Sequence, residues 1–530
     1  MKRITALLLV MIMCAGLVAC GKDSGSNAVV TPNATPAPDG STLDLGVWDE
    51  INSDKIAEAM GAGWNCGNQL EANSGGNPNE IAWNGSVITP NLIKAVADAG
   101  FKSIRVPVSY LNKIDDANGY KIDDAWLDRV REVVDYCIAE DLFVIINIHG
   151  DGYESVTGGW LHPGAENQEY ILEKYAAVWK QIAEKFIDYD ERVIFESMNE
   201  MGAERNCTKE LYDDINAYNK VFVDTVRQTG GNNAKRWVLI PGYNTNIDQT
   251  AENENFVIPE DEYLSEAIPV GENRIMISVH YYDPWSFCGG ETDEATQWGV
   301  DADPTKTANW GDEAVLEGQF KKLYDKFTSK GYPVIVGEYG AIDKSKADEE
   351  NNYFRAYFCK SVCEASKKYG CVPVYWDNGY NGKDGFGLFN RKEAACPQTQ
   401  PEIISAIMSV YSDESTDSGK ATSVTLSKTE LTIEAGTAPV TLVATTDTGE
   451  AVTWKSDNNL VATVSKEGVV YPQKAGTCKI TAACGSAKAE CTVTVKDATA
   501  TNVKLYILET KGWQTCASEE GVSLKSPGKY

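Results

Sequence analysis

The stretch that decides the fold is "RVIFESMNEMG", Arg192–Gly202. Its first part is an apolar run typical of a buried strand, made by Val193, Ile194, Phe195 and Met198. Two polar residues, Asn199 and Glu200, follow where the run leaves the core. Turn chemistry is one explanation for an amide and a carboxylate at such a strand end, and catalysis is the other. The rest of the chain discriminates between them.

Similar apolar runs recur along the chain, with centres near residues 64, 106, 146, 195, 239, 278, 336 and 374. Segments with helical periodicity separate them, such as "AWLDRVREVVDYCIAED" at 125–141. Eight short strands, each followed by a helix, predict an α/β fold, the (β/α)8 barrel, within residues 41–412. An open doubly wound sheet is the alternative, but no glycine-rich phosphate loop follows any of the runs.

Polar or aromatic side chains recur at the ends of these runs, where the catalytic groups of such barrels lie. They are Asn65, Asn68, Arg105, His149, Asn199, Glu200, His280, Tyr282, Glu338 and Trp376. Each has a structural explanation of its own, since a lone histidine is more often a core residue and a buried arginine is usually paired. Their common position on one rim favours a shared functional site.

Composition narrows the possible partners. The chain has 530 residues, a formal net charge of −29 and a pI near 4.6. This charge disfavours nucleic acid and anionic membrane surfaces as partners, and it does not oppose a neutral glycan. The sequence contains three histidines, none in a His-Glu-x-x-His motif, and no Gly-x-Ser-x-Gly motif. We therefore predict neither a metal site nor a serine nucleophile.

Two carboxylates remain, Glu200 at the end of the fourth predicted strand and Glu338 at the end of the seventh. These strands lie roughly across the barrel mouth from each other. Two carboxyls that face each other across a cleft suit glycosidic cleavage, in which one protonates the leaving oxygen and the other attacks carbon or activates water. Such a reaction needs no cofactor, and we predict none.

Short motifs along the chain resemble those of glycoside hydrolase family five. In order they are "GWNCGN", "IRVPVSY", "NIHGDGY", "FESMNE", "HYYDPWSF", "GEYG", "VYWDNG" and "GFGLFNR". The resemblance covers roughly residues 45–410 and is closest to the cellulase-type subfamily four, with its endoglucanases and xyloglucanases. It implies an active-site set of Arg105, His149, Asn199, Glu200, His280, Tyr282, Glu338 and Trp376.

The resemblance also implies roles. Glu200 is expected to be the general acid and then the base, with a raised pKa, and Glu338 the ionised nucleophile. Arg105 and Tyr282 are expected to donate hydrogen bonds to Glu338. The remaining substrate-binding residues are Asn199 at the sugar 2-hydroxyl, Trp376 as the floor under the sugar ring, and His149, His280, Asn68 and Trp285 at other positions.

Loop tryptophans form a further group that either stacks on sugar rings or packs the loops. They are Trp83, Trp160, Trp285, Trp298 and Trp310, and Trp285 is the best placed because it follows Tyr282 by three residues. One departure from the family concerns His149, which is followed by Gly150 where many relatives have a second histidine. The shared catalytic histidine is kept, and a hydroxyl contact in a neighbouring subsite is expected to be lost.

The N-terminal segment predicts export. Residues 1–20 carry Lys2 and Arg3, then an apolar run that ends in "LVAC". This ending resembles a bacterial lipobox, which implies lipidation of Cys20 and a lipoprotein held at the outer cell surface by its lipid anchor alone. An ordinary cleaved signal peptide is the alternative. Residues 21–40 are rich in Gly, Ser, Asn, Pro and Thr and predict a flexible linker.

The C-terminal part has a different pattern. Residues 413–420, "DESTDSGK", predict a second linker, and short alternating strands across residues 421–497 predict an all-β sandwich. "VTWKSDNNLVATVSKEGVV" and the strands after it resemble the bacterial immunoglobulin-like group-two domain. Residues 498–530 are too short for a domain, and we read them as a tail or the start of a truncated module.

Together these observations predict an exported, monomeric, retaining endo-β-1,4-glucanase that acts on cellulose-like glucan, mixed-linkage glucan or xyloglucan. An endo-β-mannanase or xylanase of the same family is the first alternative, and a surface glycan-binding protein without catalysis is the second. The expected partner is the polysaccharide substrate. After Cys14 and Cys20, twelve cysteines remain of the fourteen, an even number that permits disulfides.

Overall fold

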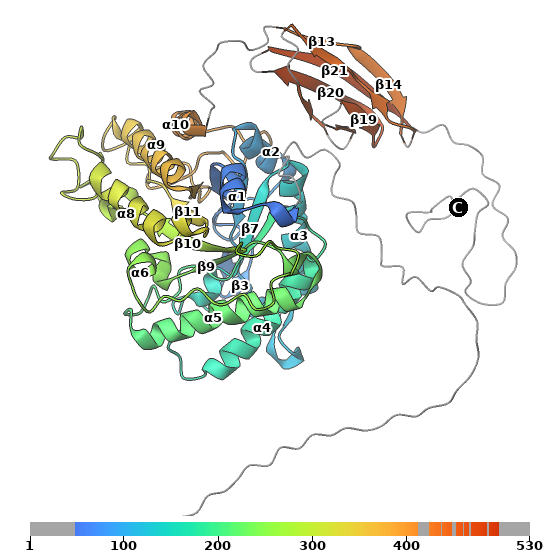
Figure 1. The fold of residues 1–530 in the computed structure, drawn as a ribbon. Coiled ribbons are helices and arrows are strands. Elements are labelled where there is room, and N and C mark those ends of the chain that lie inside the picture. The colour runs from blue at the N-terminus through green and yellow to red at the C-terminus, as the bar shows by residue number, and fades with distance from the viewer. Residues whose placement is uncertain are drawn as a thin grey trace, which may run out of the picture. The chain divides into compact units, whose positions relative to one another are not determined.

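A closed barrel of eight parallel strands forms the N-terminal folded unit (Figure 1). The computed structural model describes residues 48–411 and 423–497, except 436, 448–451, 459–460, 466–467 and 485–486. The barrel strands are β1 (Gly63–Asn65), β4 (Ser103–Val106), β7 (Phe143–Asn147), β8 (Val193–Glu196), β9 (Val238–Pro241), β10 (Ile275–Tyr281), β11 (Val334–Tyr339) and β12 (Cys371–Tyr375). Each strand pairs with the next in this order, and β1 also pairs with β12, which closes the barrel. The predicted (β/α)8 fold is confirmed.

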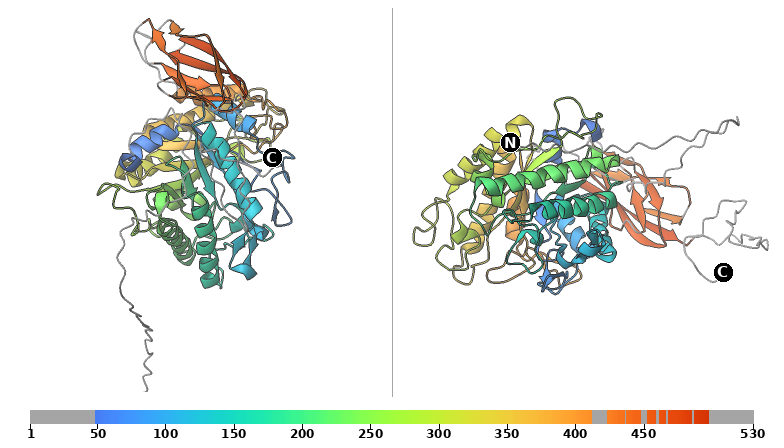
Figure 2. Two further views of the ribbon diagram at one scale, coloured as in Figure 1. Left: turned by 90° about the vertical axis from the view of Figure 1, so that its right-hand side faces the viewer. Right: turned by 90° about the horizontal axis from the view of Figure 1, so that it is seen from below.

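Helices follow the strands and lie around the outside of the barrel (Figures 1 and 2). One helix comes after each strand, namely α2 (Pro90–Asp98), α3 (Asp124–Ala139), α4 (Gln168–Lys185), α5 (Lys209–Gln228), α6 (Ile247–Ala251), α8 (Glu313–Lys326), α9 (Asn351–Tyr369) and α10 (Pro401–Tyr411). The other helices and hairpins are α1 (Ser53–Met60), α7 (Trp285–Cys288), the hairpin β2 (Asn73–Ser74) and β3 (Asn77–Pro78), and the hairpin β5 (Ile114–Asp115) and β6 (Lys121–Ile122).

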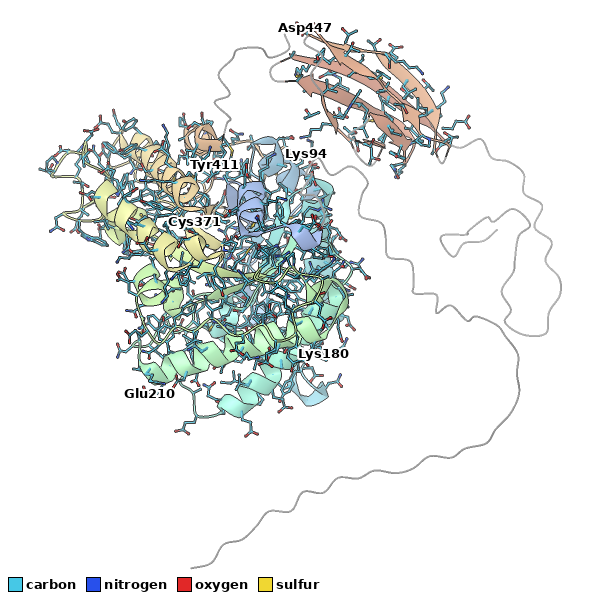
Figure 3. All side chains as sticks on the ribbon, viewed as in Figure 1. Lys94, Lys180, Glu210, Cys371, Tyr411 and Asp447 are labelled. Atoms are coloured by element: carbon cyan, nitrogen blue, oxygen red, sulfur yellow. The ribbon has the colours of Figure 1, made fainter. Side chains whose placement is uncertain are left out.

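The local sequence explains both kinds of element. Every residue of β7 and β10 is buried, as expected for parallel strands covered on both faces. Helix α3 begins where the side chain of Asp123 accepts a hydrogen bond from the backbone of Trp126. Its apolar face is buried, while charged side chains such as Lys180 on α4 and Glu210 on α5 are exposed on the outer surface (Figure 3).

Helix α1 packs against the barrel interior. Its Ile56 and Met60 are fully buried. They belong to one apolar cluster with strand residues and neighbours that include Phe143, Ile145, Ile194, Trp237, Leu239, Met276, Ile335, Val372 and Val374. This cluster fills the part of the barrel where the strands begin, so a binding site must lie at the opposite end, where the strands finish.

A second unit is all-β. Its strands are β13 (Val424–Leu426), β14 (Glu430–Glu434), β15 (Val440–Thr441), β16 (Ala444–Thr446), β17 (Thr453–Ser456), β18 (Ala462–Val464), β19 (Val469–Pro472), β20 (Gly476–Cys484) and β21 (Ala487–Lys496). They form sheets in the orders β14-β21-β20-β17, β15-β19-β18 and β13-β16. Residues such as Leu442, Trp454, Ile480 and Val493 make a core of their own. The predicted C-terminal β-domain is confirmed.

Several predicted segments lie outside the described residues: the leader at 1–20 with Cys20, the linkers at 21–40 and 413–420, and the tail at 498–530. Among the helices that the structure does describe, none combines the length and the hydropathy of a membrane-crossing segment. In the described barrel the cysteines are free thiols, most of them buried, such as Cys371 (Figure 3).

Candidate active site

A pocket of about 530 Å³ opens at the end of the barrel where the strands finish. Eight of the residues predicted from the sequence line it: His149, Asn199, Glu200, His280, Tyr282, Trp285, Glu338 and Trp376. Arg105 lies beneath them and is fully buried. Asn68 does not line this pocket, and its carbonyl instead accepts a hydrogen bond of 3.0 Å from Asn84.

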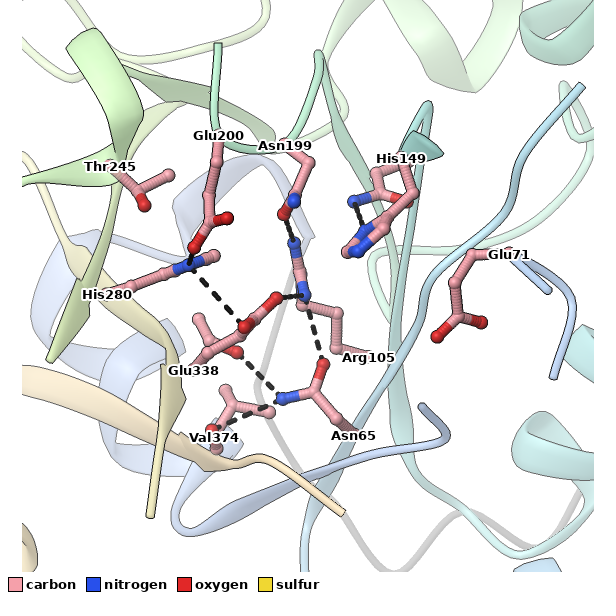
Figure 4. A network of polar contacts seen from close by, with 12 residues as sticks. Asn65, Glu71, Arg105, His149, Asn199, Glu200, Thr245, His280, Glu338 and Val374 are labelled. Carbon is pink, nitrogen blue, oxygen red and sulfur yellow. Dashed lines mark hydrogen bonds and ion pairs between the residues drawn. The ribbon is translucent and has the colours of Figure 1, made fainter. Parts of the chain in front are cut away.

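Glu200 and Glu338 face each other across the floor of this pocket (Figure 4). One carboxylate oxygen of each lies within 4.8 Å of the other and of a nitrogen of His280. Nδ1 of His280 forms a 2.8 Å hydrogen bond with Oε1 of Glu200. The hydroxyl of Tyr282 donates a 3.1 Å hydrogen bond to Oε2 of Glu338. The barrel therefore brings together two carboxyls that are 138 residues apart in the sequence (338 − 200).

Arg105, near the end of β4, donates hydrogen bonds to four side chains at the floor of the pocket. Its Nη1 donates to Oε1 of Glu338 at 2.8 Å and to Oδ1 of Asn65 at 3.1 Å. Its Nη2 donates to Oδ1 of Asn199 at 2.7 Å, and its Nε to Oε2 of Glu196 at 2.7 Å. The predicted hydrogen bonds from Arg105 and Tyr282 to Glu338 are both present. A guanidinium with four acceptors is fixed in position, so it also fixes the carboxylate of Glu338.

Glu196 is the principal residue that the sequence-based reasoning missed. It is fully buried in β8, and besides Arg105 it accepts hydrogen bonds from Ser278 at 2.7 Å and from Asn147 at 2.9 Å. The signal was available, because a carboxylate inside an otherwise apolar strand is costly to bury without a partner. Glu196 does not line the pocket, so it orients Arg105 rather than the substrate.

Aromatic side chains form the walls of the pocket. Trp376 lies parallel to the ring of His149, with 6.2 Å between the ring centroids. Trp285 is 59% exposed and packs edge-on against Tyr282. Of the other loop tryptophans, Trp160 and Trp298 are buried and pack the loops, and Trp83 and Trp310 are exposed away from the pocket.

The surroundings shift the pKa values of the two carboxyls in opposite directions. Burial raises the pKa of Glu200, but the hydrogen bonds with His280 and from Tyr153 outweigh it and bring the pKa below its ordinary value. Burial raises the pKa of Glu338 above its ordinary value, although Arg105 opposes the rise. The expected raised pKa of Glu200 is therefore wrong for the free site, because two hydrogen bonds stabilise the Glu200 anion. Burial also holds the pKa of His149 well below its ordinary range, so this ring is neutral.

Comparison with protein families agrees with this geometry. Residues 65–382 match the family described as "Cellulase (glycosyl hydrolase family 5)". The chain belongs to glycoside hydrolase family 5. Residues 450–497 match the bacterial Ig-like domain, within the all-β unit of this glycoside hydrolase. The family assignment agrees with the order of motifs read from the sequence, and it makes the protein a glycosidase.

Named relatives of this family 5 enzyme match about two thirds of the chain. Endoglucanase A of Paenibacillus barcinonensis is 54% identical over 361 residues, which are 68% of this chain and 90% of the relative. A family 5 xyloglucanase from Paenibacillus pabuli, solved in complex with ligand, is 56% identical, with a TM-score of 0.65 over 67% of this chain and 99% of that one. A broad-specificity endoglucanase from Bacteroides salanitronis is 39% identical, with a TM-score of 0.62 over 68% and 95% of the two chains.

Proposed function

We propose that this family 5 glycoside hydrolase is an endo-β-1,4-glucanase that cleaves β-glucans with retention of configuration. The observation that carries the proposal is the separation of Glu200 and Glu338, whose nearest carboxylate oxygens lie within 4.8 Å of each other. Retaining glycosidases have carboxyls about 5–5.5 Å apart, and inverting enzymes need roughly 6.5–9.5 Å. The names of the relatives, endoglucanases and xyloglucanases, support a glucan backbone as substrate.

The first chemical step forms a glycosyl-enzyme. The ionised carboxylate of Glu338, held by Arg105 and Tyr282, attacks the anomeric carbon and forms an ester bond. The bond from that carbon to the leaving oxygen breaks, and Glu200 gives its proton to this oxygen. Asn199 lies beside both carboxyls, bound to Arg105, and is placed to bind the sugar 2-hydroxyl.

The second step releases the sugar. Glu200, now a carboxylate, takes a proton from water while the water oxygen bonds to the anomeric carbon. The ester bond to Glu338 breaks, and its electrons return to the carboxylate. Two inversions at one carbon give the β-anomer from a β-glucan, and Glu200 ends the cycle protonated.

Substrate binding favours the protonation state that this mechanism needs. The side chain of Glu200 is 25% exposed in the free site, and that of Glu338 is 8% exposed. A sugar ring bound over the pair therefore removes more water from Glu200 than from Glu338. Because loss of water raises the pKa of a carboxyl, binding favours the protonated form of Glu200.

A neutral glucan fits the rest of the pocket. Trp376 presents an apolar ring face, and Trp285 supplies an exposed ring at the pocket edge. The net charge of −29 does not oppose a neutral chain, whereas a polyuronate would be repelled. The test is a reducing-sugar assay on carboxyl-free cellulose derivatives, mixed-linkage glucan, xyloglucan, mannan, xylan and a polyuronate. We expect the highest rates on one of the β-1,4-linked glucans, and a mannan or xylan as the best substrate would contradict the proposal.

We also propose that the enzyme is exported and held at the outer cell surface, as a monomer, by lipid on Cys20. The support is the sequence Leu17-Val18-Ala19-Cys20 after an apolar run. Cys20→Ala is expected to release the protein from membranes or to block its maturation. Fractionation of cells that express the variant and the wild type tests this, and an unchanged membrane fraction would contradict it.

A further inference from the structure

Tyr153 lies beside Glu200 and has no role in the mechanism above. Its hydroxyl donates a 2.5 Å hydrogen bond to Oε2 of Glu200, and its oxygen accepts a 3.1 Å hydrogen bond from Nδ2 of Asn199. Tyr153 also lines the pocket. Burial and the charge of Glu200 hold the pKa of Tyr153 well above its ordinary value, so the hydroxyl keeps its proton while the carboxyls titrate.

Arg105 fixes the direction of these hydrogen bonds. A guanidinium has only donors, so the atom of Asn199 that faces Nη2 at 2.7 Å must be the oxygen Oδ1. The amide nitrogen of Asn199 therefore faces Tyr153 and occupies an acceptor position of its hydroxyl. The hydrogen of that hydroxyl is left for Glu200. A chain of donors thus runs from Arg105 to Glu200 and stabilises the charged form of Glu200.

Two glycines allow the turn before Tyr153 to pack closely. A Cβ on Gly150 would lie 2.6 Å from Oγ of Ser109. A Cβ on Gly152 would lie 1.9 Å from Cε of Met201. A side chain at either position would require Ser109 or Met201 to move aside, so the two glycines leave room for the side chains that pack against the turn.

Asp151 anchors the same turn. Its buried carboxylate accepts hydrogen bonds from the backbone nitrogens of Tyr110 at 2.9 Å and Leu111 at 2.7 Å. Nε1 of Trp160 donates a third hydrogen bond, at 2.7 Å. Three donors on one buried carboxylate hold the turn in place, so the position of Tyr153 does not depend on its own hydroxyl alone.

We propose that Tyr153 is a positioning residue for Glu200. Its hydroxyl holds the carboxylate in the orientation that proton transfer needs, and it stabilises the anion that remains after the proton has passed to the leaving oxygen. This inference rests on the proposed retaining mechanism. It also assigns a purpose to the turn from Gly150 to Tyr153, because this turn supplies a hydrogen bond to the acid/base carboxylate.

A test must measure the ionisation of Glu200 separately from the ionisation of its titratable neighbours. The charged or titratable groups that face it or share its pocket are Arg105, His149, Tyr153, Asp248, His280, Tyr282, Asp283 and Glu338. An activated 2-deoxy-2-fluoro-cellobioside traps the glycosyl-enzyme, in which Glu338 is an ester and no longer titrates. The rate of sugar release then follows the ionisation of Glu200, which must accept a proton from water.

The variant is Tyr153→Phe, which removes only the hydroxyl. Loss of this donor makes the Glu200 anion less stable, so the pKa rises. We expect the pH midpoint of sugar release to move up by about one pH unit. The matched control is Tyr243→Phe, because the Tyr243 hydroxyl donates to the backbone of Arg205 and the residue does not line the pocket. The control is expected to keep the wild-type midpoint.

A second measurement compares leaving groups. Tyr153→Phe is expected to slow the cleavage of cello-oligosaccharides about tenfold more than the cleavage of an aryl cellobioside. The aryl group of the second substrate leaves without a proton, so its cleavage does not need Glu200 as an acid. An unchanged midpoint together with equal losses on both substrates, in a variant with the wild-type melting temperature, would overturn the role of Tyr153. A wild-type enzyme that forms no covalent intermediate would instead contradict the proposed function itself.

Discussion

Glu200 and Glu338 face the same nitrogen of His280. Nδ1 lies 2.8 Å from Oε1 of Glu200 and 3.6 Å from Oε2 of Glu338. This shared neighbour keeps the two carboxyls closer than the roughly 6.5–9.5 Å that an inverting site needs to admit a water molecule between acid and base. The geometry therefore favours direct attack by one carboxyl, and the stereochemistry of the product reports it.

The first prediction is that hydrolysis of a β-glucan gives the β-anomer as the initial product. Direct attack by Glu338 inverts the anomeric carbon once, and attack by water inverts it again. Proton NMR of the reaction, recorded before mutarotation, distinguishes the anomers. An initial α-anomer would contradict the assignment of Glu338 as nucleophile.

Two variants provide the controls. Glu338→Ala is expected to be nearly inactive on every substrate, because no glycosyl-enzyme can form. Glu200→Ala is expected to lose about 10²–10⁴-fold on glucans but to keep forming the intermediate from an activated aryl glycoside, whose leaving group departs unprotonated. Azide should then rescue Glu200→Ala and give the β-glycosyl azide. A fully active Glu200→Ala would show that Glu200 merely ends a turn.

The second prediction concerns Arg105 and its buried partner Glu196. Arg105→Met leaves the fully buried Glu196 carboxylate without its cation. Removal of one partner of a buried ion pair costs about 3–5 kcal/mol, so we expect a loss of that size in the free energy of unfolding. Denaturant unfolding followed by tryptophan fluorescence measures it.

A double variant separates stability from activity. Arg105→Met with Glu196→Gln removes both charges, and we expect it to recover most of the lost stability. Activity should stay low in both variants, because Glu338 has lost its donor on Nη1 in each. If the double variant is as unstable as the single one, the Arg105–Glu196 pair is not the source of the loss.

The sequence predicts the barrel and most of its site because both depend on local patterns. Strands such as Val193–Glu196 are short apolar runs, and the groups that follow them share one rim whatever their distance along the chain. The position of Glu200 and Glu338 opposite each other follows from strand order alone. This is why the carboxyl pair could be identified before the structure.

Contacts that depend on loop conformation could not be predicted in this way. Tyr153 reaches Glu200 because a turn packs two glycines against Ser109 and Met201, which only the folded chain brings together. Asn68 follows the first strand yet does not line the pocket, and its backbone adopts a positive φ of 60°. The lowered pKa of Glu200 also depends on folded contacts, because the hydrogen bonds with His280 and then from Tyr153 outweigh the effect of burial.

The third prediction is that residues 41–412 fold alone and keep most activity on soluble glucans. Every residue that lines the pocket belongs to the barrel. The apolar clusters of the barrel and the β-domain share no residue, so each unit has its own core. Rates of the truncated and full-length proteins on a soluble β-glucan test this. Loss of activity in a truncated protein that retains its circular dichroism spectrum would contradict a spacer role for the β-domain.

The fourth prediction is a loss of stability at low pH that depends on His149. Burial and the nearby charge of Arg105 hold the pKa of His149 well below the ordinary value of 6.5, so the folded protein keeps this ring neutral. The unfolded chain binds a proton there as the pH falls through about 6.5, and the folded protein does not. Stability is therefore highest above this pH and declines below it, by up to about 1.4 kcal/mol per pH unit for this one group.

Comparison with His149→Gln isolates this contribution. The variant has no group that titrates at position 149, so its free energy of unfolding should fall less steeply than that of the wild type between pH 7 and pH 5. Urea unfolding of both proteins at several pH values, followed by tryptophan fluorescence, gives the two slopes. The variant starts from a lower stability because it loses the ring that stacks against Trp376. Parallel slopes would mean that His149 takes up its proton as readily in the folded protein as in the unfolded chain, which would contradict the lowered pKa of this ring.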